Sequence, residues 1–544
     1  MKLFEQDKSV FPFIHINQAG RYGRYGMFLK MVGNIPVPSQ DNYYTIARQI
    51  VLGLVTGTTY YLDASAENGG NGSIDTPWNT LSAAMSGITN GDCVMVYDGE
   101  YGDYSATTTY TAWTVFMSVK GTVPKLSRIN IDRETNGNCN LIFFGFEIEP
   151  DYVDPSTSGQ TGADDPQYAH SVPNTYAKSA NPINLVNADN VRIYYCTIYG
   201  YNKHLTDRGI SILTSDSVRI DHCEVHTVNR GIVWITCTNL TLWYNYVHGT
   251  ASSFMVDGNV NDSSGILIEG NHCHNMTWLY SEDYCLREPD YYYHGSLLAI
   301  NSANCTIRKN LLHDGGNSAG VMFYSGATYS NIIFENNVIY DPHNTNAFVM
   351  YSPGENIVIR NNTIIGRGVY SAAETNMKYS GALQIYSSSS GFDYSDISFY
   401  NNIILGITNF EDGITLLNHS NNIFFAVMDD WAFYDSEDMP NDIVVIQNGS
   451  SGDWDYFETN FFNGTLRRDW SYWTIDDAVW MLLTVNPAGH GQILNLTLYS
   501  GCDGDNYSDT GNDPDTAIGT LSSSTFLLDN GASRLSSSDA GALN

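Results

Sequence analysis

The fold is decided by the stretch Val191-Arg-Ile-Tyr-Tyr-Cys-Thr-Ile198 and by its copies along the chain. The pattern is apolar, any, apolar, any, any, Cys or Asn, any, apolar. Seven more copies begin at Val218, Leu240, Ile266, Cys305, Ile332, Ile357 and Ile397, and a looser copy, Leu141-Ile-Phe-Phe-Gly-Phe-Glu-Ile148, precedes them. The distances from one start to the next are 27, 22, 26, 39, 27, 25 and 40 residues. The two long distances indicate one coil plus an insertion.

The spacing of the apolar positions predicts strands, because residues two apart lie on one face of a strand. Short strands that repeat about every 25 residues are typical of a parallel solenoid. The sixth position of the pattern is polar, and an unpaired buried amide costs a few kcal/mol. We therefore expect these side chains to hydrogen-bond from coil to coil in a ladder. The sixth positions are Cys196, Cys223, Asn245, Asn271, Asn310, Asn337, Asn362 and Asn402.

This repeat resembles the right-handed parallel β-helix family typified by pectate lyases and phage tailspikes, over about residues 58–430. The segment from Tyr60-Tyr-Leu-Asp to Gly91-Asp-Cys-Val looks like the first strand, capping helix and first coil of such proteins. The tail from Asp529-Asn-Gly-Ala also looks like theirs. The resemblance implies an all-β chain: a single-stranded right-handed parallel β-helix with an N-terminal segment and an irregular C-terminal cap.

We expect four regions along the chain. Insertions at about 149–181, 275–293 and 367–392 are predicted to leave the coils at turns and to build walls beside them. Within the last region, residues 476–483 are predicted to form a short helix. The four regions are an N-terminal attachment segment (1–57), the opening and cap of the β-helix (58–120), the rod of coils (121–428) and a C-terminal capping region (429–544).

The charge of the chain argues against two kinds of partner. It has 25 Lys and Arg against 58 Asp and Glu, a formal net charge of −33. Binding to nucleic acid or to an anionic membrane surface depends on basic side chains, so neither is expected. No stretch approaches the ~18 apolar residues of a membrane span. The first residues lack the apolar core of a secretory signal, which favours a protein assembled into a virion inside its host over a secreted one.

The nine cysteines contain no C-x-x-C pair, so neither a zinc ribbon nor a thioredoxin-like site is indicated, and buried free thiols are predicted. No cofactor and no metal site are predicted. A Ca²⁺ ion at the acidic turn Asp503-Gly-Asp-Asn-Tyr-Ser-Asp509 is kept as an alternative, although the turn lacks the glycine and glutamate spacing of a calcium loop.

Two arginines mark the first candidate site. Arg208 and Arg230 occupy equivalent positions on adjacent coils, in the turn before a strand. Stacked ~5 Å apart they would repel each other, so an anion is expected beside them. It is either a carboxylate of the fold, such as Asp207, or a uronate or sulfate of a substrate held by two hydrogen bonds.

The insertion at 275–293 is predicted to form a cleft over these arginines. In a lyase, Arg208 or Arg230 would neutralise the uronate, His294 would take the proton and Tyr293 would give one to the leaving oxygen. A glycosidase needs two carboxylates instead. Candidates for these are Glu282, Asp283, Asp207 and Asp257, while Arg287, Tyr291 and Tyr292 are expected to bind substrate. A solvated acidic loop without a ligand is the alternative.

Histidines recur at the ninth position, one residue after the pattern, at His226, His248, His274 and His313. A histidine stack can bind a metal or transfer protons. We expect a structural role in a turn, because the same position also holds Tyr199 and Tyr340.

The predicted function is that of a tailspike-like virion protein, which in that family is a homotrimer that binds and often cleaves a surface polysaccharide. Residues 1–57 are expected to contact other virion proteins. Two alternatives stay open: a free-standing extracellular polysaccharide lyase, and a structural or adhesin β-helix without catalysis. The sequence does not choose between lyase and glycoside hydrolase.

Overall fold

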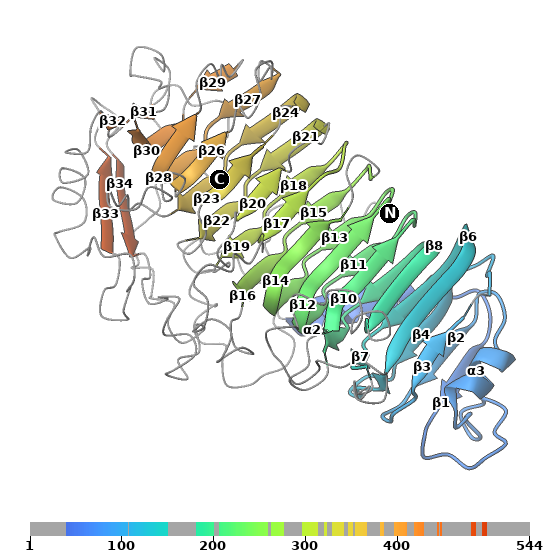
Figure 1. Cartoon of the computed structure of the whole chain (residues 1–544). Helices are drawn as coiled ribbons and strands as arrows, with labels where there is room; N and C mark the ends of the chain where they lie inside the picture. Colours follow the sequence, from blue (N-terminus) through green and yellow to red (C-terminus); the bar gives the residue numbers. More distant parts are fainter. Residues whose placement is uncertain are drawn as a thin grey trace, which may run out of the picture. The chain divides into compact units, whose positions relative to one another are not determined.

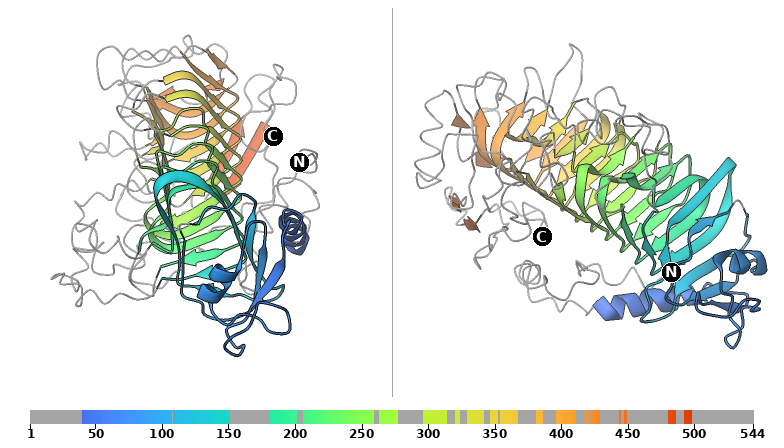
Figure 2. Two further views of the ribbon diagram at one scale, coloured as in Figure 1. Left: turned by 90° about the vertical axis from the view of Figure 1, so that its right-hand side faces the viewer. Right: turned by 60° about the horizontal axis from the view of Figure 1, so that its bottom comes forward.

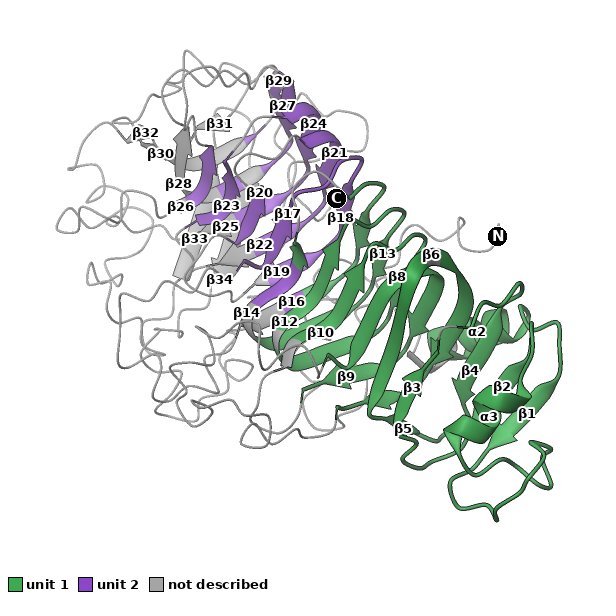
Figure 3. Cartoon of the chain, turned by 45° about the vertical axis from the view of Figure 1, so that its right-hand side comes forward, with its two compact units in different colours: residues 1–17, 36–251, 256–272 green, residues 18–35, 252–255, 273–544 purple. Residues whose placement is uncertain are grey.

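Apolar residues at alternate positions fold into parallel strands that stack coil upon coil (Figure 1). The chain divides into two compact units (Figure 3): unit 1 holds residues 1–17, 36–251 and 256–272, and unit 2 holds residues 18–35, 252–255 and 273–544. The computed structural model describes residues 40–106, 108–150, 181–200, 206–258, 263–276, 296–313, 320–323, 329–341, 346–351, 354–366, 381–385, 396–410, 418–420, 422–428, 443–444, 447–448, 480–485 and 492–497.

Unit 1 opens with two helices and continues as coils. The helices are α2 (Gln40–Leu52) and α3 (Leu81–Gly87), and the Thr80 hydroxyl caps α3 by accepting a hydrogen bond from the backbone N–H of Ala83. The strands are β1 (Thr59–Leu62), β2 (Cys93–Val96), β3 (Asp103–Ser105), β4 (Thr114–Ser118), β5 (Lys125–Leu126), β6 (Arg128–Phe144), β7 (Glu147–Ile148), β8 (Ile183–Tyr194), β9 (Thr197–Tyr199), β10 (Thr206–Leu213), β11 (Arg219–Asp221), β12 (Glu224–Ile235), β13 (Thr241–Trp243), β14 (Tyr246–Asp257) and β15 (Leu267–Glu269).

Unit 2 continues the same alternation of short parallel strands. The elements with most of their residues in it are β16 (His272–Met276), β17 (Leu298–Ile300), β18 (Thr306–Arg308), β19 (Leu311–His313), β20 (Val321–Phe323), β21 (Tyr329–Glu335), β22 (Val338–Asp341), β23 (Asn346–Met350), β24 (Gly354–Arg360), β25 (Thr363–Gly366), β26 (Gly381–Ile385), β27 (Ile397–Tyr400), β28 (Ile403–Phe410), β29 (Asn418–Ser420), β30 (Ile423–Met428), β31 (Ile443–Val444), β32 (Gln447–Asn448), β33 (Trp480–Val485) and β34 (Gln492–Thr497).

The strand register places equal positions of the pattern on top of one another. In unit 1 the third-position residues Ile193, Ile220, Leu242 and Ile268 are successive partners, and all are fully buried. In unit 2 the pairs Ile307–Phe334 and Ile359–Phe399 continue the same rule. The predicted parallel β-helix is confirmed, with its apolar first and third positions inside the coils.

The fifth position turns the chain at every copy of the pattern. Its residue has a positive φ, of 52° at Tyr195, 53° at His222 and 52° at Tyr244 in unit 1, and of 54° at Asn336 in unit 2. Bulky residues rarely adopt this conformation, which costs about 1 kcal/mol or more. It persists here because the residue that follows is fixed by hydrogen bonds.

Those hydrogen bonds form the predicted ladder at the sixth position. In unit 2, Asn337 Oδ1 accepts from the backbone N–H and the Nδ2 of Asn310, at 3.0 and 2.9 Å. Asn362 Oδ1 accepts in the same way from Asn337, and Asn402 and Asn422 repeat the arrangement. All five amides are buried. In unit 1 the ladder runs from Asn271 through Asn245 to the N–H of Cys223.

Helix α2 lies against the outside of the first coils of unit 1 (Figure 2). The Tyr44 ring contacts the rings of Phe144 and Tyr195 edge-on, at centroid distances of 5.1 and 5.2 Å. Val51 is buried, and Arg48 Nη1 donates to the carbonyl of Ser118 at 2.5 Å. This part of the predicted attachment segment therefore packs on its own coils, and residues 1–39 lie outside the described residues.

The helix predicted at residues 476–483 is wrong at residues 480–483, and residues 476–479 lie outside the described residues. The structure has a strand there, β33, paired antiparallel with β34 from Trp480–Thr497 to Val485–Gln492. A run of apolar residues reads equally well as a buried helix or a strand, and here pairing with a distant segment decides.

Candidate functional site

The two predicted arginines lie side by side. Arg208 in β10 and Arg230 in β12 are register partners, which confirms that they occupy adjacent coils. They lie within strands and not in a turn, because pairing continues from Thr206 to Leu213. Arg208 Nη1 donates to Ser211 Oγ at 3.2 Å. Within the described ranges, Arg230 forms no ion pair.

The cleft predicted over these arginines cannot be placed. Asp257 is fully buried, so it is not the surface carboxylate that a glycosidase would need. The side chain of Asp207 lies outside the described residues. Residues 277–295 also lie outside the described residues, and they contain most of the insertion and the predicted residues Glu282, Asp283, Arg287, Tyr291, Tyr292, Tyr293 and His294.

A second group of titratable side chains lies on the outside of unit 1, on the strands that follow the ladder turn. The register aligns Lys125 with Glu147, and Glu147 with Thr197 and Glu224. It also aligns Tyr199 with His226. Because side chains two apart share a face of a strand, both rows point to the same side. We call the group the Glu–Tyr–His cluster: Lys125, Glu147, Glu149, Tyr199, Glu224, His226 and His248.

The acidic half of the cluster is built around one hydroxyl. The Tyr199 hydroxyl contacts the Glu147 carboxylate and lies 3.2 Å from Glu149 Oε2. Lys125 Nζ forms ion pairs with both carboxylates, at 3.8 Å from Glu147 Oε1. Burial raises the pKa of Tyr199, and the Glu147 and Glu149 carboxylates raise it further. Tyr199 therefore keeps its proton at neutral pH, and its hydroxyl is held by the Glu147 carboxylate.

The basic half is a stack of rings. His226 lies flat between Tyr199 and His248, with centroid distances of 5.1 Å on both sides and interplanar angles of 10° and 19°. His248 Nε2 lies 3.0 Å from Glu224 Oε1, and His226 Nδ1 lies 2.9 Å from Thr227 Oγ1. Burial lowers the pKa of His226 to about 4, and His248 adds to the effect against the opposing Glu224. His226 is therefore neutral near pH 7 and can accept a proton.

The cluster stacks a protonated tyrosine, Tyr199, against a neutral histidine, His226. Perturbed pKa values of this kind gather at functional sites, although ion-pair networks also produce them. Glu147 and Glu149 both contact the Tyr199 hydroxyl, so the cluster brings together two carboxylates, the residue type that a glycosidase needs. The arrangement can therefore serve acid–base chemistry on a glycosidic bond.

The sequence pointed to part of this cluster and missed the rest. His226 and His248 were noted at the ninth position, but they lie in strands β12 and β14 and not in a turn. Glu147 and Glu149 were missed. They hold the seventh and ninth positions of the looser copy that begins at Leu141. Their place in that copy could have predicted that they align with Thr197 and Tyr199 of the next copy.

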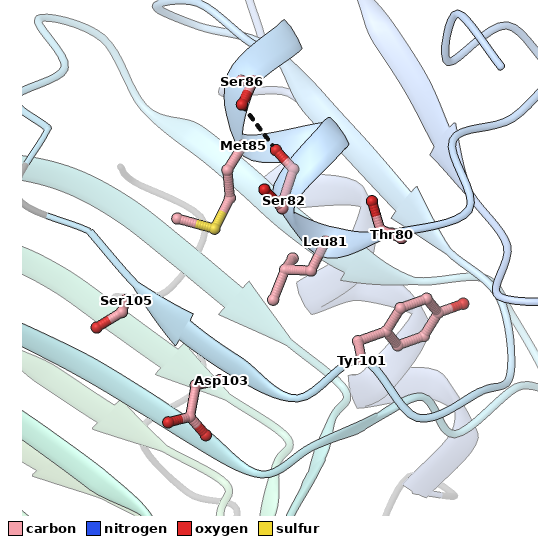
Figure 4. Close-up of a pocket in the computed structure, with 8 residues that line it drawn as sticks. All are labelled: Thr80, Leu81, Ser82, Met85, Ser86, Tyr101, Asp103 and Ser105. Carbon is pink, nitrogen blue, oxygen red and sulfur yellow. Dashed lines mark hydrogen bonds between the residues drawn. The ribbon is translucent and has the colours of Figure 1, made fainter. Parts of the chain in front are cut away.

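A pocket beside α3 is a weaker candidate (Figure 4). Its polar groups are mostly serine and threonine hydroxyls, with Asp103 as the acid on its floor. The Tyr101 hydroxyl at its edge donates to the carbonyl of Tyr97 at 2.9 Å, and burial raises the pKa of Tyr101 to about 12. The Tyr101 hydroxyl is thus held by the backbone, and the described residues that line the pocket include no histidine.

Other predicted features are tested only in part. The seven cysteines within the described ranges are buried free thiols, as predicted for them. Across those ranges no three His, Cys, Asp or Glu side chains gather as a metal-binding group, and the acidic turn Asp503–Asp509 lies outside them. Among the described helices none is long and apolar enough to span a membrane.

Comparison with known proteins identifies the repeat. Residues 183–404 match the family model described as a right handed beta helix region. No curated protein matches the chain. Similar solved structures include a pectate lyase (13% identity, TM-score 0.38, 68% of this chain and 80% of that one) and an α-1,3-glucanase from Streptomyces thermodiastaticus (13%, 0.43, 72% and 69%). A lacto-N-biosidase from Eubacterium ramulus is similar at 11% identity and a TM-score of 0.41, over 75% of this chain and 72% of that one. With TM-scores below 0.5, these similarities say nothing about what this chain binds.

Proposed function

We propose that this protein, a right-handed parallel β-helix over residues 183–404, binds a polysaccharide on the outside of its coils and cleaves it at the Glu–Tyr–His cluster. One observation carries the proposal. A tyrosine that keeps its proton, Tyr199, is stacked on a histidine that stays neutral, His226. Cleavage of a glycosidic bond needs one group that gives a proton and one that takes a proton, and we assign these roles to the two stacked residues.

The residues of the cluster offer two routes, elimination and hydrolysis. In elimination from a uronate, His226 would take the proton next to the carboxylate and Tyr199 would give one to the leaving oxygen. Lys125 is the cation of the cluster, and it would bind the substrate carboxylate in exchange for one of its glutamates. In hydrolysis, Glu147 and Glu149 would act as the carboxylate pair. The two routes leave different products.

The test is to incubate the protein with a panel of acidic and neutral polysaccharides. Elimination predicts unsaturated ends that absorb near 235 nm, and hydrolysis predicts reducing ends without that absorbance. Tyr199→Phe should abolish either activity, and Lys120→Gln, at an exposed turn of the same unit, should leave it intact. Activity that survives unchanged in Tyr199→Phe would place the reaction elsewhere.

Glycan binding without cleavage is the second candidate, and one observation favours it. The carboxylates of the cluster are already bonded, Glu147 and Glu149 to Lys125 and Glu224 to His248. Such a network also stabilises stacked strands, as cross-strand pairs do. Binding to a polysaccharide that stays intact would support this reading.

The finer part of the proposal is a tailspike-like role: a homotrimer on a virion tail, attached through the N-terminal segment. Its support is the resemblance of the repeat and of the opening segment to tailspikes. Because α2 packs on its own coils, a truncation should remove only residues 1–39. For the full chain, analytical ultracentrifugation should give three times the 60.3 kDa mass of one chain. A monomer would favour the free-standing extracellular lyase.

A further inference from the structure

The outside of the strands that precede the ladder turn changes character along unit 1. On the first coils it is apolar: Val115, Met117 and Phe144 lie there beneath Tyr44 and Val51 of α2. The next coils continue the same two positions with different residues. In the strand register, Arg192 and Arg219 follow Ile142 on the next two coils. Phe144 is followed in the same way by Tyr194, Asp221 and Trp243. A charged and aromatic surface therefore begins where the apolar one ends.

The arginines of this surface are held flat on aromatic rings. The Arg192 guanidinium carbon lies 4.1 Å from the centroid of the Trp113 ring. The Arg219 guanidinium carbon lies 4.5 Å from the Trp243 centroid and 5.8 Å from the Tyr194 centroid. We call these five residues the arginine–tryptophan strip. A guanidinium stacked on a ring keeps its N–H groups in the plane, where they can form two parallel hydrogen bonds to a carboxylate.

The two arginines differ in their partners. Arg219 Nε and Nη2 donate to Asp221 Oδ2 at 2.8 and 2.6 Å, and this carboxylate is buried. Arg192 forms no ion pair with any described residue. The two guanidinium groups come from partner residues on adjacent strands, ~4.8 Å apart along the stack. The Asp221 carboxylate is therefore bonded to Arg219 and contacts His222, and its column continues through Trp243 to Glu269, the register partner of Trp243. Arg192 is the arginine of the strip that no described carboxylate pairs.

Unit 2 has arginines at the fourth position of the pattern, and there both contact one carboxylate. There Arg360 donates to Glu335 Oε2 at 2.8 Å and to the Tyr400 hydroxyl at 2.9 Å, and Arg308 lies 3.9 Å from Glu335 Oε1. Its residues follow one another along a ladder of strands, as in unit 1. Both unit 2 arginines therefore contact a carboxylate, whereas Arg192 in unit 1 has no such partner among the described residues.

We propose that the arginine–tryptophan strip binds an acidic oligosaccharide, with a sugar carboxylate on Arg192 and sugar rings against the tryptophans. The Arg192 guanidinium, which has no ion pair among the described residues, is locally complementary to an anion. Partly exposed tryptophan beside it offers a flat apolar surface for sugar rings. The strip lies on the strands before the ladder turn and the Glu–Tyr–His cluster on those after it, so the two sites are separate. The choice of a saccharide as ligand rests on the proposed function.

Isothermal titration tests the strip by binding, independently of cleavage. The probes are hexamers of galacturonate, mannuronate and glucuronate, with a glucose hexamer and a hexaglutamate peptide for comparison. We expect one uronate hexamer to bind at least tenfold more tightly than the glucose hexamer and the peptide. Arg192→Gln should weaken that binding about tenfold or more, as loss of a charge-assisted bond does. Trp243→Phe, which keeps a ring, should weaken it less.

Lys120→Gln is the matched control, since it removes one exposed charge from unit 1 at a turn. It should change the affinity less than twofold, and circular dichroism should show all variants folded. Three results would overturn the proposal: no uronate hexamer bound at 1 mM, equal effects of Arg192→Gln and Lys120→Gln, or hexaglutamate bound as tightly as the uronates. Loss of cleavage with binding intact would refute the proposed function alone.

Discussion

Replacing Asn337 by leucine should destabilise unit 2, because this amide is fully buried and bonded on both sides. Its Oδ1 accepts two hydrogen bonds from Asn310, at 3.0 and 2.9 Å. Its Nδ2 donates to the carbonyl of Ile307 at 3.0 Å and to Asn362 Oδ1 at 3.1 Å. Leucine has nearly the same volume and can form none of these four bonds.

The magnitude follows from those four bonds. At ~1 kcal/mol net each, they contribute about 4 kcal/mol to the free energy of unfolding. The leucine side chain regains about 1–2 kcal/mol by apolar burial. The expected net loss is about 2–3 kcal/mol. Most of it arises at the backbone N–H of Asn310, which would face leucine in place of an acceptor.

The matched control is Asn331→Gly. Asn331 also lies in a column of stacked amides, bonded to Asn304 at 2.9 Å and to Asn356 at 2.8 Å, but it is exposed. Its φ of 55° suits glycine, and water replaces its bonds, so the expected change is about 0.5 kcal/mol or less.

Urea unfolding followed by circular dichroism compares the two variants, and hydrogen exchange shows where protection is lost. Asn337→Leu should lower the midpoint and speed exchange around Asn310. Equal midpoints for the two variants would refute the reasoning that burial makes the sixth-position ladder important.

Three further predictions concern unit 1. Asp221→Asn should lower the free energy of unfolding in urea by about 2–4 kcal/mol. Burial raises the pKa of Asp221, but Arg219 and His222 outweigh burial and lower that pKa, so the fold needs the ionised carboxylate. An unchanged urea midpoint would contradict this. The pKa of His226 is about 4 in the fold against 6.5 in the unfolded chain. The unfolded chain therefore takes up the proton first, and the free energy of unfolding should fall as pH drops from 6.5 toward 4. The His226→Phe variant should lose less free energy of unfolding over that interval, and equal losses in both proteins would count against the pKa shift. Tyr199→Phe should lower the rate of glycan cleavage at least about 100-fold without changing the urea midpoint, as loss of a general acid does.

The fold could be predicted because each position of the repeat requires one type of residue. Residues two apart gave the strands, and the sixth position gave the ladder, since a buried polar side chain such as Asn310 needs a partner at a fixed place on the next coil. These signals depend on neighbouring coils of the same pattern, so they can be read without long-range information. β33 had no such pattern, and its pairing with β34 could not be foreseen.

The candidate site was less predictable. The adjacency of Arg208 and Arg230 followed from counting positions, but their placement in strands did not. The chain bends at Thr227, with φ of 56°, while the strand pairing continues beyond it. The sequence around Thr227 does not show whether the strand pairing ends there, as it would at a turn, or continues past a bend. Glu147 and Glu149 were not predicted as site residues, because their copy of the pattern has Phe146 in place of the sixth-position Asn or Cys.

The most direct test of the proposed function is a crystal structure of the Glu147→Gln variant with a fragment of the polysaccharide that the protein binds. The account predicts a sugar ring against the Glu–Tyr–His cluster, with the glycosidic oxygen within ~3 Å of the Tyr199 hydroxyl. A fully occupied sugar elsewhere on the chain, with nothing beside Tyr199 and His226, would contradict it.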